Sequence, residues 1–159
     1  MKKFLGAIIS GAVGVLTLIF LTMPAFEKES LLKTNKYSGW DLLTNKGVGK
    51  WEFTAVNWYR IFAWVLVVLA VILIVMAVIQ LLSSLGIVKI SKMFTKLTIW
   101  TLVAILVVSV LTLAANFGIR GEWIDVTRAK DAYGVGVSLW FVAITNLIGA
   151  VAGKVFVKD

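Results

Sequence analysis

The stretch that decides the fold is IFAWVLVVLAVILIVMAVIQLLSSLGIV, residues 61–88, which runs for 28 residues without a charged side chain. A helix needs about 20 apolar residues to cross a bilayer core of about 30 Å. At about 1.5 Å per residue, this run would be about 42 Å long as one helix. We therefore expect a transmembrane helix that tilts or extends beyond the membrane.

Three other runs are equally free of charge, at residues 4–26, 97–119 and 132–153. The whole chain is 60% hydrophobic with a mean hydropathy of +0.98, whereas roughly half of a soluble domain is apolar. The sequence predicts one all-α integral membrane domain over residues 1–159, a left-handed bundle of four helices. The expected helices are residues 4–26, 58–86, 97–118 and 133–154, with outer loops at 27–57 and 119–132 and an inner loop at 87–96.

The first run also has features of a secretory signal peptide, because Lys2 and Lys3 precede it. A signal peptide has an apolar region of roughly 7–15 residues that ends at a small-residue cleavage site. This run is longer and ends in Met-Pro-Ala-Phe, residues 23–26. We expect it to remain in the protein as a helix whose outer end is marked by Pro24.

Basic residues give the expected orientation. Seven cations against one acid fall in the short termini and the 87–96 loop, while nine cations against seven acids are spread over the two longer loops. Positive charge concentrated in short flanks marks the cytoplasmic side. We expect a multi-pass protein of the cell membrane with both termini in the cytoplasm. The basic flanks suit anionic lipid headgroups better than nucleic acid, which we do not expect as a partner.

Small residues recur at spacings that let helices approach closely in lipid. Gly6, Ser10 and Gly14 are four apart in the first run, and Gly149 and Gly153 are four apart in the last. A seven-residue repeat of alanines, which favours a left-handed crossing, runs through the second. We expect packing within one chain rather than between copies, at Gly6, Ser10, Gly14, Ala63, Ala70, Ala77, Gly149 and Gly153.

The first outer loop predicts a small β-hairpin. Residues 40–44 and 48–53 flank Asn45-Lys46-Gly47, a turn sequence typical of antiparallel strands. The alternative is a loop that lies on headgroups, anchored by Trp40 and Trp51. Glycines and Ser91 mark expected helix ends, at Gly86, Ser91, Gly118, Gly121, Gly134 and Gly136.

The chain has no cysteine and no histidine, which excludes disulfides, thiolate nucleophiles and the common zinc and haem ligands. None of the four uncharged runs has an ionisable side chain, the usual mark of a proton relay or ion path. Glu122 and Asp125, with Asp131 or Asp41, are the candidates for a cation site, but hard cations need several converging oxygens in a glycine-turned loop, and we favour a solvated loop instead. We expect no enzyme activity, no catalytic residues, no cofactor and no metal.

Three amide side chains stand out in the apolar runs, at Gln80, Asn116 and Asn146. Such groups most often form hydrogen bonds between helices, worth roughly 0.6–2 kcal/mol. The alternative is that they line a narrow polar path. We favour helix packing because no repeated ring of donors is visible.

The layout of short inner termini, a longer first outer loop with tryptophans and a short basic inner loop resembles the claudin-like tetraspan families. Gly39, Trp40 and Trp51 echo their outer-loop motif, but both cysteines of that motif are missing. The Ser-Gly-Trp-Asp-Leu stretch, residues 38–42, also resembles small tetraspan proteins of low-GC Gram-positive bacteria. The claudin-like resemblance implies a sheet-bearing outer lobe and a function through contacts with other membrane proteins.

We therefore expect a non-catalytic tetraspan protein, an accessory subunit or scaffold in a membrane assembly. Its partners would be membrane lipid and another membrane protein or a second copy. Trp40, Trp51 and Trp123 are the candidate partner contacts. The alternatives are a small channel or carrier for an uncharged solute, along Gln80, Asn116 and Asn146, and an immunity-type protein against a membrane-active peptide.

Overall fold

The computed structural model describes residues 2–30, 33–44, 54–127 and 133–157. This part of the chain forms five helices and three strands. In chain order they are α1 (Lys2–Phe20), β1 (Pro24–Ser30), β2 (Lys33–Ser38), α2 (Gly39–Thr44), α3 (Thr54–Ser84), α4 (Lys92–Thr127), β3 (Tyr133–Val135) and α5 (Ser138–Phe156).

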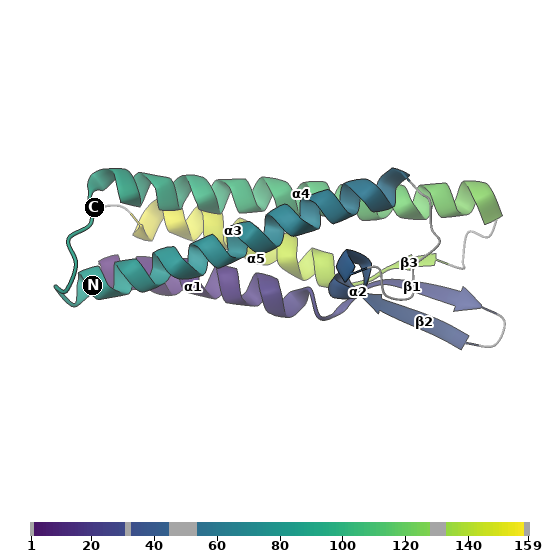
Figure 1. Cartoon of the computed structure of the whole chain (residues 1–159), viewed down its shortest axis with the longest axis horizontal. Coiled ribbons are helices and arrows are strands. Elements are labelled where there is room, and N and C mark those ends of the chain that lie inside the picture. Colours follow the sequence, from purple (N-terminus) through teal and green to yellow (C-terminus); the bar gives the residue numbers. More distant parts are fainter. Residues whose placement is uncertain (1, 31–32, 45–53, 128–132, 158–159) are drawn as a thin grey trace.

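The four long helices run side by side along the longest axis of the molecule (Figure 1). α1 packs against α3 and α5, and α4 packs against the same two helices. The sheet and α2 lie together at one end of this bundle, while α1 begins and α5 ends at the other (Figure 1). Successive long helices are therefore antiparallel.

Three of these helices, α3, α4 and α5, are long and apolar enough to cross a membrane, and α1 has a shorter apolar stretch, Phe4–Phe20. Large apolar side chains cover their outward faces, with Val68, Val107 and Ile148 more than half exposed. The interior holds polar side chains among its apolar ones, including Thr17, Thr112 and Asn146 at 0% exposure. Apolar side chains on the outside with polar ones turned inward fit hydrocarbon surroundings, because lipid cannot satisfy hydrogen bonds. The expected predominantly helical, membrane-type architecture is thus present.

The first helix ends at Phe20, six residues before the predicted end at Phe26. Pro24 disfavours helical geometry at Met23, and two turn hydrogen bonds, from Thr22 N to Ile19 O and from Met23 N to Phe20 O, close the helix. The chain then continues as β1, whose Ala25 and Phe26 are fully buried. The predicted boundary was wrong because uncharged residues at 21–26 serve the core of a sheet rather than a membrane span.

The predicted ends of the other helices were also wrong in part. α4 continues through Gly118 and Gly121 to Thr127, so residues 119–127 are helical rather than loop. Burial of Ile119 and the partial burial of Trp123 against the same core offset the roughly 1 kcal/mol that each glycine costs a helix. α3 begins at Thr54 rather than residue 58. α5 begins at Ser138 because Tyr133–Val135, which includes Gly134, is a strand.

The inner connection between α3 and α4 is present but shifted from the predicted 87–96, because α3 ends at Ser84 rather than residue 86 and α4 begins at Lys92 rather than residue 97. Gly86, two residues beyond α3, has a φ of 78°, which glycine adopts readily. Ser91 precedes α4, and its Oγ accepts a hydrogen bond from the backbone N–H of Phe94 at 3.3 Å. This is the contact of an N-cap serine.

The sheet has the strand order β2-β1-β3, with both neighbouring pairs antiparallel. An antiparallel pair therefore lies in the first long connection, but in residues 24–38 and not where it was predicted. Residues 40–44 belong to helix α2, so the first predicted strand was wrong, while the second, residues 48–53, lies outside the described residues. We refer to the sheet, α2 and residues 119–127 of α4 as the lobe.

A capping box explains why α2 is a helix. Ser38 Oγ accepts a hydrogen bond from the backbone N–H of Asp41 at 3.1 Å, and Asp41 Oδ2 accepts one from the backbone N–H of Ser38 at 2.9 Å. These two bonds satisfy backbone donors that the first turn of a helix leaves unpaired. Leu42 and Leu43 are then buried beside Tyr59 and Phe26 in the core of the lobe.

Replacing Ser38 with alanine should destabilise the lobe, because both hydrogen bonds to Asp41 that use the serine hydroxyl are lost. Loss of an N-cap costs about 1 kcal/mol. Thermal unfolding in mild detergent, followed by tryptophan fluorescence, would measure it. Thr44→Ala is the matched control, since this exposed hydroxyl bonds only back to Trp40 O within α2. Equal effects of the two substitutions would contradict the capping role.

Candidate functional site

The small residues of α1 lie against α3. A Cβ added to Gly14 would come within 2.6 Å of Ala70 O and 2.7 Å of Ile74 Cγ1, so the two backbones approach more closely than any larger residue allows. A Cβ on Gly11 would meet the Ala77 side chain at 3.3 Å. Ala63, Ala70 and Ala77 are all buried. The seven-residue alanine repeat therefore lies on the inward face of α3.

The glycines of α5 accept side chains from two neighbours. A Cβ on Gly149 would overlap Val13 of α1, and one on Gly153 would overlap Leu102 of α4. At the end of the bundle away from the lobe, Gly6 lies against Phe156 O and Val157. Ser10 is buried, and its hydroxyl donates to Gly6 O within α1 at 2.9 Å. All eight predicted packing residues thus face other helices of the same chain or lie buried beside them.

Replacing Gly14 with alanine should destabilise the bundle, because the new Cβ would force α1 away from the backbone of α3. Overpacking of this kind costs about 1–3 kcal/mol. Gly121→Ala is the matched control, since a Cβ there meets nothing within 4 Å and helix propensity favours alanine by about 1 kcal/mol. Unfolding in detergent followed by circular dichroism should show opposite shifts for the two variants. A Gly14→Ala protein as stable as the native chain would contradict this close approach.

The three amides lie at different levels of the bundle. Gln80 Nε2 donates to Thr98 Oγ1 at 2.9 Å, which joins α3 to α4. Asn146 Oδ1 accepts from Thr17 Oγ1 at 3.0 Å, which joins α5 to α1. Asn116 Nδ2 donates to Ala25 O at 2.8 Å, which joins α4 to β1. Thr98 and Asn116 are 18 residues apart on α4, about 27 Å along its axis, so the amides do not form one site.

Hydroxyl groups of α4 satisfy themselves locally. Thr98, Thr101, Ser109 and Thr112 each donate to a carbonyl three or four residues earlier, a bond that keeps the hydroxyl against its own helix. Two buried amide atoms, Gln80 Oε1 and Asn146 Nδ2, have no hydrogen-bond partner within the described part of the chain. Each amide still makes one bond to a neighbouring element, so the structure gives all three a packing contact.

Several hydrogen bonds attach the lobe to the bundle. The Ala25 carbonyl accepts both from Asn116 Nδ2 and from the backbone N–H of Gly136, each at 2.8 Å. The backbone N–H of Trp40 donates to Leu21 O at 3.2 Å, and next to this bond the Ser138 hydroxyl donates to Phe20 O, which joins α5 to α1 within the bundle. The lobe is therefore fixed to the ends of α1, α4 and α5 at once.

Glu122 has a structural contact rather than a metal-binding one. Its Oε1 accepts a hydrogen bond from the backbone N–H of Ala55 at 3.1 Å, at the start of α3. A carboxylate at this position pairs with an unsatisfied N–H and with the positive end of the helix dipole. Across the residues that the structure describes, no group of three or more acidic side chains could hold a metal ion.

Two of the candidate partner-contact tryptophans, Trp40 and Trp123, are partly buried. Trp40 and Trp123 pack against the core of the lobe, and Lys28 Nζ lies 4.5 Å from the centroid of the Trp123 ring. Trp51 lies outside the described residues. The tryptophans with the most exposed side chains are instead on the bundle, among them Trp58 at 53%, Trp64 at 52% and Trp100 at 70%.

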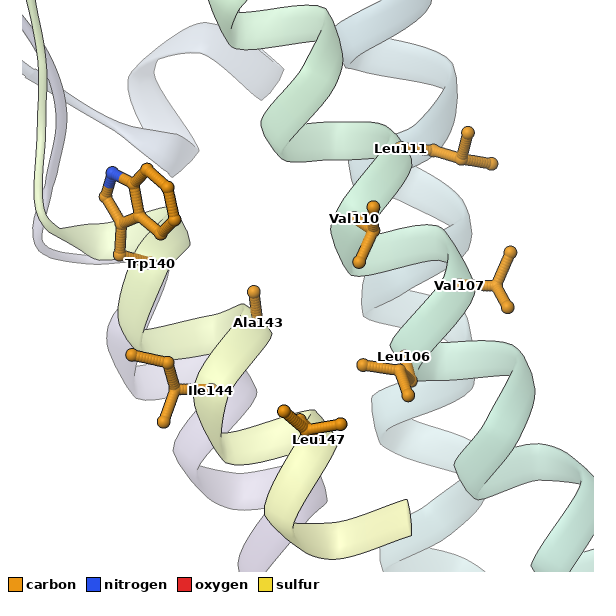
Figure 2. A pocket seen from close by; sticks show the side chains of 8 residues that line it. All are labelled: Leu106, Val107, Val110, Leu111, Trp140, Ala143, Ile144 and Leu147. Carbon is orange, nitrogen blue, oxygen red and sulfur yellow. The ribbon is translucent and has the colours of Figure 1, made fainter. Parts of the chain in front are cut away.

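An open groove between α4 and α5, which we call the crevice, has a volume of about 500 Å³. Figure 2 shows side chains of both helices facing this space, with Trp140 at the end nearest the lobe. Sequence reasoning missed it, because a crevice depends on how two helices diverge and not on either helix alone. Its lining is aliphatic apart from one indole: Leu106, Val107, Val110, Leu111, Trp140, Ala143, Ile144 and Leu147.

A smaller groove of about 240 Å³ lies on the other side of α5, against α1. Its lining includes Ala12, Leu16 and Ile148. Grooves therefore border α5 on both sides, whereas the α1–α3 contact is the most extensive in the bundle.

No protein-family model, curated protein or solved structure matches this chain. Its function therefore has to be argued from its own residues.

Proposed function

We propose that this chain is a four-span, non-catalytic protein of the cell membrane that acts through contacts with other membrane proteins, as an accessory subunit or scaffold. The observation that carries the proposal is the lobe, a small sheet and helix held firmly at one end of an apolar bundle. The residues that attach it, Ala25, Asn116 and Gly136, fix its orientation relative to the bundle. A folded surface held in this way is suited to binding a partner rather than to transport.

The polar groups of the described residues support this proposal. The amides of Gln80, Asn116 and Asn146 each bond to a neighbouring element, and Glu122 bonds to the start of α3. A polar path would need the three amides, and a cation site would need Glu122. Because all four side chains bond to neighbouring elements, these contacts favour a structural role for them. The lobe retains exposed polar positions on β2, including Thr34 and Lys36, where a partner can bind.

In the proposed topology, α1 is the fourth span and both termini are cytoplasmic. The 19 residues of α1 reach about 28 Å, close to the core thickness of about 30 Å. The lysines Lys89, Lys92, Lys96 and Lys154 are exposed at the end of the bundle opposite the lobe. Their density there favours the cytoplasmic face by the positive-inside rule.

Single cysteines test this topology on a background that has none of its own. Thr34→Cys in β2 and Lys89→Cys beyond α3 both replace exposed side chains. In intact cells, a membrane-impermeant maleimide should label the first and spare the second, while inverted vesicles should give the reverse. Labelling of both positions from one side would rule out this arrangement of spans.

A photo-crosslinking residue in place of Lys36 should join the lobe to its partner. The Lys36 side chain is 60% exposed and makes one ion pair, to Glu27 at 2.9 Å. In membranes of the producing cell, we expect one or a few discrete adducts, identified by mass spectrometry. The same probe in place of Trp100, exposed near the other end of the bundle, is the matched control. Absence of adducts from Lys36 and from a second lobe position, Thr34, would count against partner binding through the lobe.

A further inference from the structure

The crevice arises because α4 and α5 diverge toward the lobe. In the half of the bundle away from the lobe, Gly153 lets Leu102 approach the α5 backbone. In the half nearer the lobe, the facing residues of α5 are Trp140, Ala143, Ile144 and Leu147. Phe117 and Trp140 then meet edge to face, with ring centroids 6.0 Å apart. The crevice is thus bounded along the bundle by these two contacts and opens sideways.

The dimensions of the crevice favour one hydrocarbon chain over a helix. Its lining covers residues 140–147 of α5, which is about two turns or 10 Å of helix length. A partner helix that crosses the membrane would need a contact surface along about 30 Å. A helix with its side chains is also about 10–12 Å wide. A volume of about 500 Å³ lies within the roughly 300–1,000 Å³ of small-molecule pockets. A flexible acyl chain satisfies both limits.

Arg120 supplies a charge near the lobe end of the crevice. It follows Leu102 by 18 residues, five turns of α4, and so lies on the same side of α4 as Leu102. It is also about one turn beyond Phe117. Its side chain is partly buried, and its Nε has no hydrogen-bond partner in the parts of the chain that are described. A guanidinium at this place is complementary to a phosphate, which it can bind through paired N–H groups.

The distance between this charge and the far end of the crevice matches one leaflet of a bilayer. Leu106 precedes Arg120 by 14 residues, about 21 Å along α4. One leaflet has about 15 Å of hydrocarbon, beyond which lie the glycerol and phosphate groups. Trp140, 47% exposed, lies between these levels, where indole rings prefer the membrane interface.

We propose that the crevice binds an anionic phospholipid, with one acyl chain between α4 and α5 and the phosphate at Arg120. This inference rests on the membrane placement proposed above, but not on which compartment the lobe faces. The lipid site is separate from the proposed partner-binding surface, because the lipid would lie on the side of the bundle and would leave the lobe accessible to a protein partner.

The test uses the full chain reconstituted in vesicles of equal parts phosphatidylglycerol and phosphatidylcholine. After extraction in mild detergent, native mass spectrometry counts the lipids that stay bound. We expect one phospholipid per chain, enriched in phosphatidylglycerol. Arg120→Gln should reduce this enrichment at least about tenfold, because the charge-assisted hydrogen bonds from the guanidinium to the phosphate are lost. Lys96→Gln, a cation at the other end of α4, should leave it unchanged.

Two substitutions fill the crevice. Ala143→Phe and Ile144→Trp each place an aromatic ring in the crevice. Ile144 is half-exposed, so the stability of the fold depends less on this side chain, and the second variant remains informative if the first does not fold. Both should remove the retained lipid, while Val75→Phe on the outward face of α3 should not. Native lipid retention in both crevice variants, or undiminished enrichment in Arg120→Gln, would overturn the proposal. A polypeptide retained in place of the lipid would overturn it as well.

The topology experiment separates the two proposals. If Thr34→Cys and Lys89→Cys are labelled from opposite sides but no lipid is retained by the native chain, the lipid site is wrong and the membrane placement stands. If both cysteines are labelled from one side, the placement itself is wrong.

Discussion

Hydrocarbon offers no hydrogen-bond partner, and this constraint governs how the helices are arranged. The backbone of a helix satisfies itself, but hydroxyl and amide side chains must turn inward or back onto their own helix. Thr17, Thr112 and Asn146 do so, while valine, isoleucine and leucine cover the outside. Because the outer surface gains nothing from burial against another helix in lipid, contacts form where backbones approach closely. Gly14 against Ala70 is the clearest example.

The same constraint explains why the two ends of the bundle differ. Away from the lobe, Gly6, Gly149 and Gly153 allow α5 to approach α1 and α4 closely. Toward the lobe, α5 carries Trp140 and Ile144, and the helices diverge. Of the polar groups there, Asn116 attaches the sheet through Ala25 O, and Ser138 joins α5 to the end of α1. One sequence gradient in residue size thus produces both a crevice and a place to anchor the lobe.

The helical bundle was largely predictable because uncharged runs and small-residue spacings are local signals. The residues expected at helix contacts, such as Gly14 and Ala70, do lie there. The lobe was not predictable in detail. The turn sequence Asn45-Lys46-Gly47 suggested a strand at Trp40–Thr44, while the Ser38-x-x-Asp41 capping box, at the start of the same stretch, indicated the helix that forms. Polar residues of β1 gave no strand pattern, since their pairing with β2 and β3 is set by tertiary contacts. Gly118 and Gly121 suggested that the helix ends near residue 118. The helix continues to Thr127 because Ile119 and Trp123 pack against the core.

The Ala25 carbonyl has a consequence for how the protein is made. It lies just after the first helix, yet its two hydrogen-bond donors, Asn116 and Gly136, come 91 and 111 residues later in the chain. During synthesis the amino-terminal strand therefore waits for the second of these donors until the segment just before the last helix has been made. A ribosome product that stops before residue 136 would leave this strand without its β3 neighbour, as an open sheet edge that proteases and chaperones can recognise. Completion of the lobe thus requires that the chain has been made at least as far as Gly136.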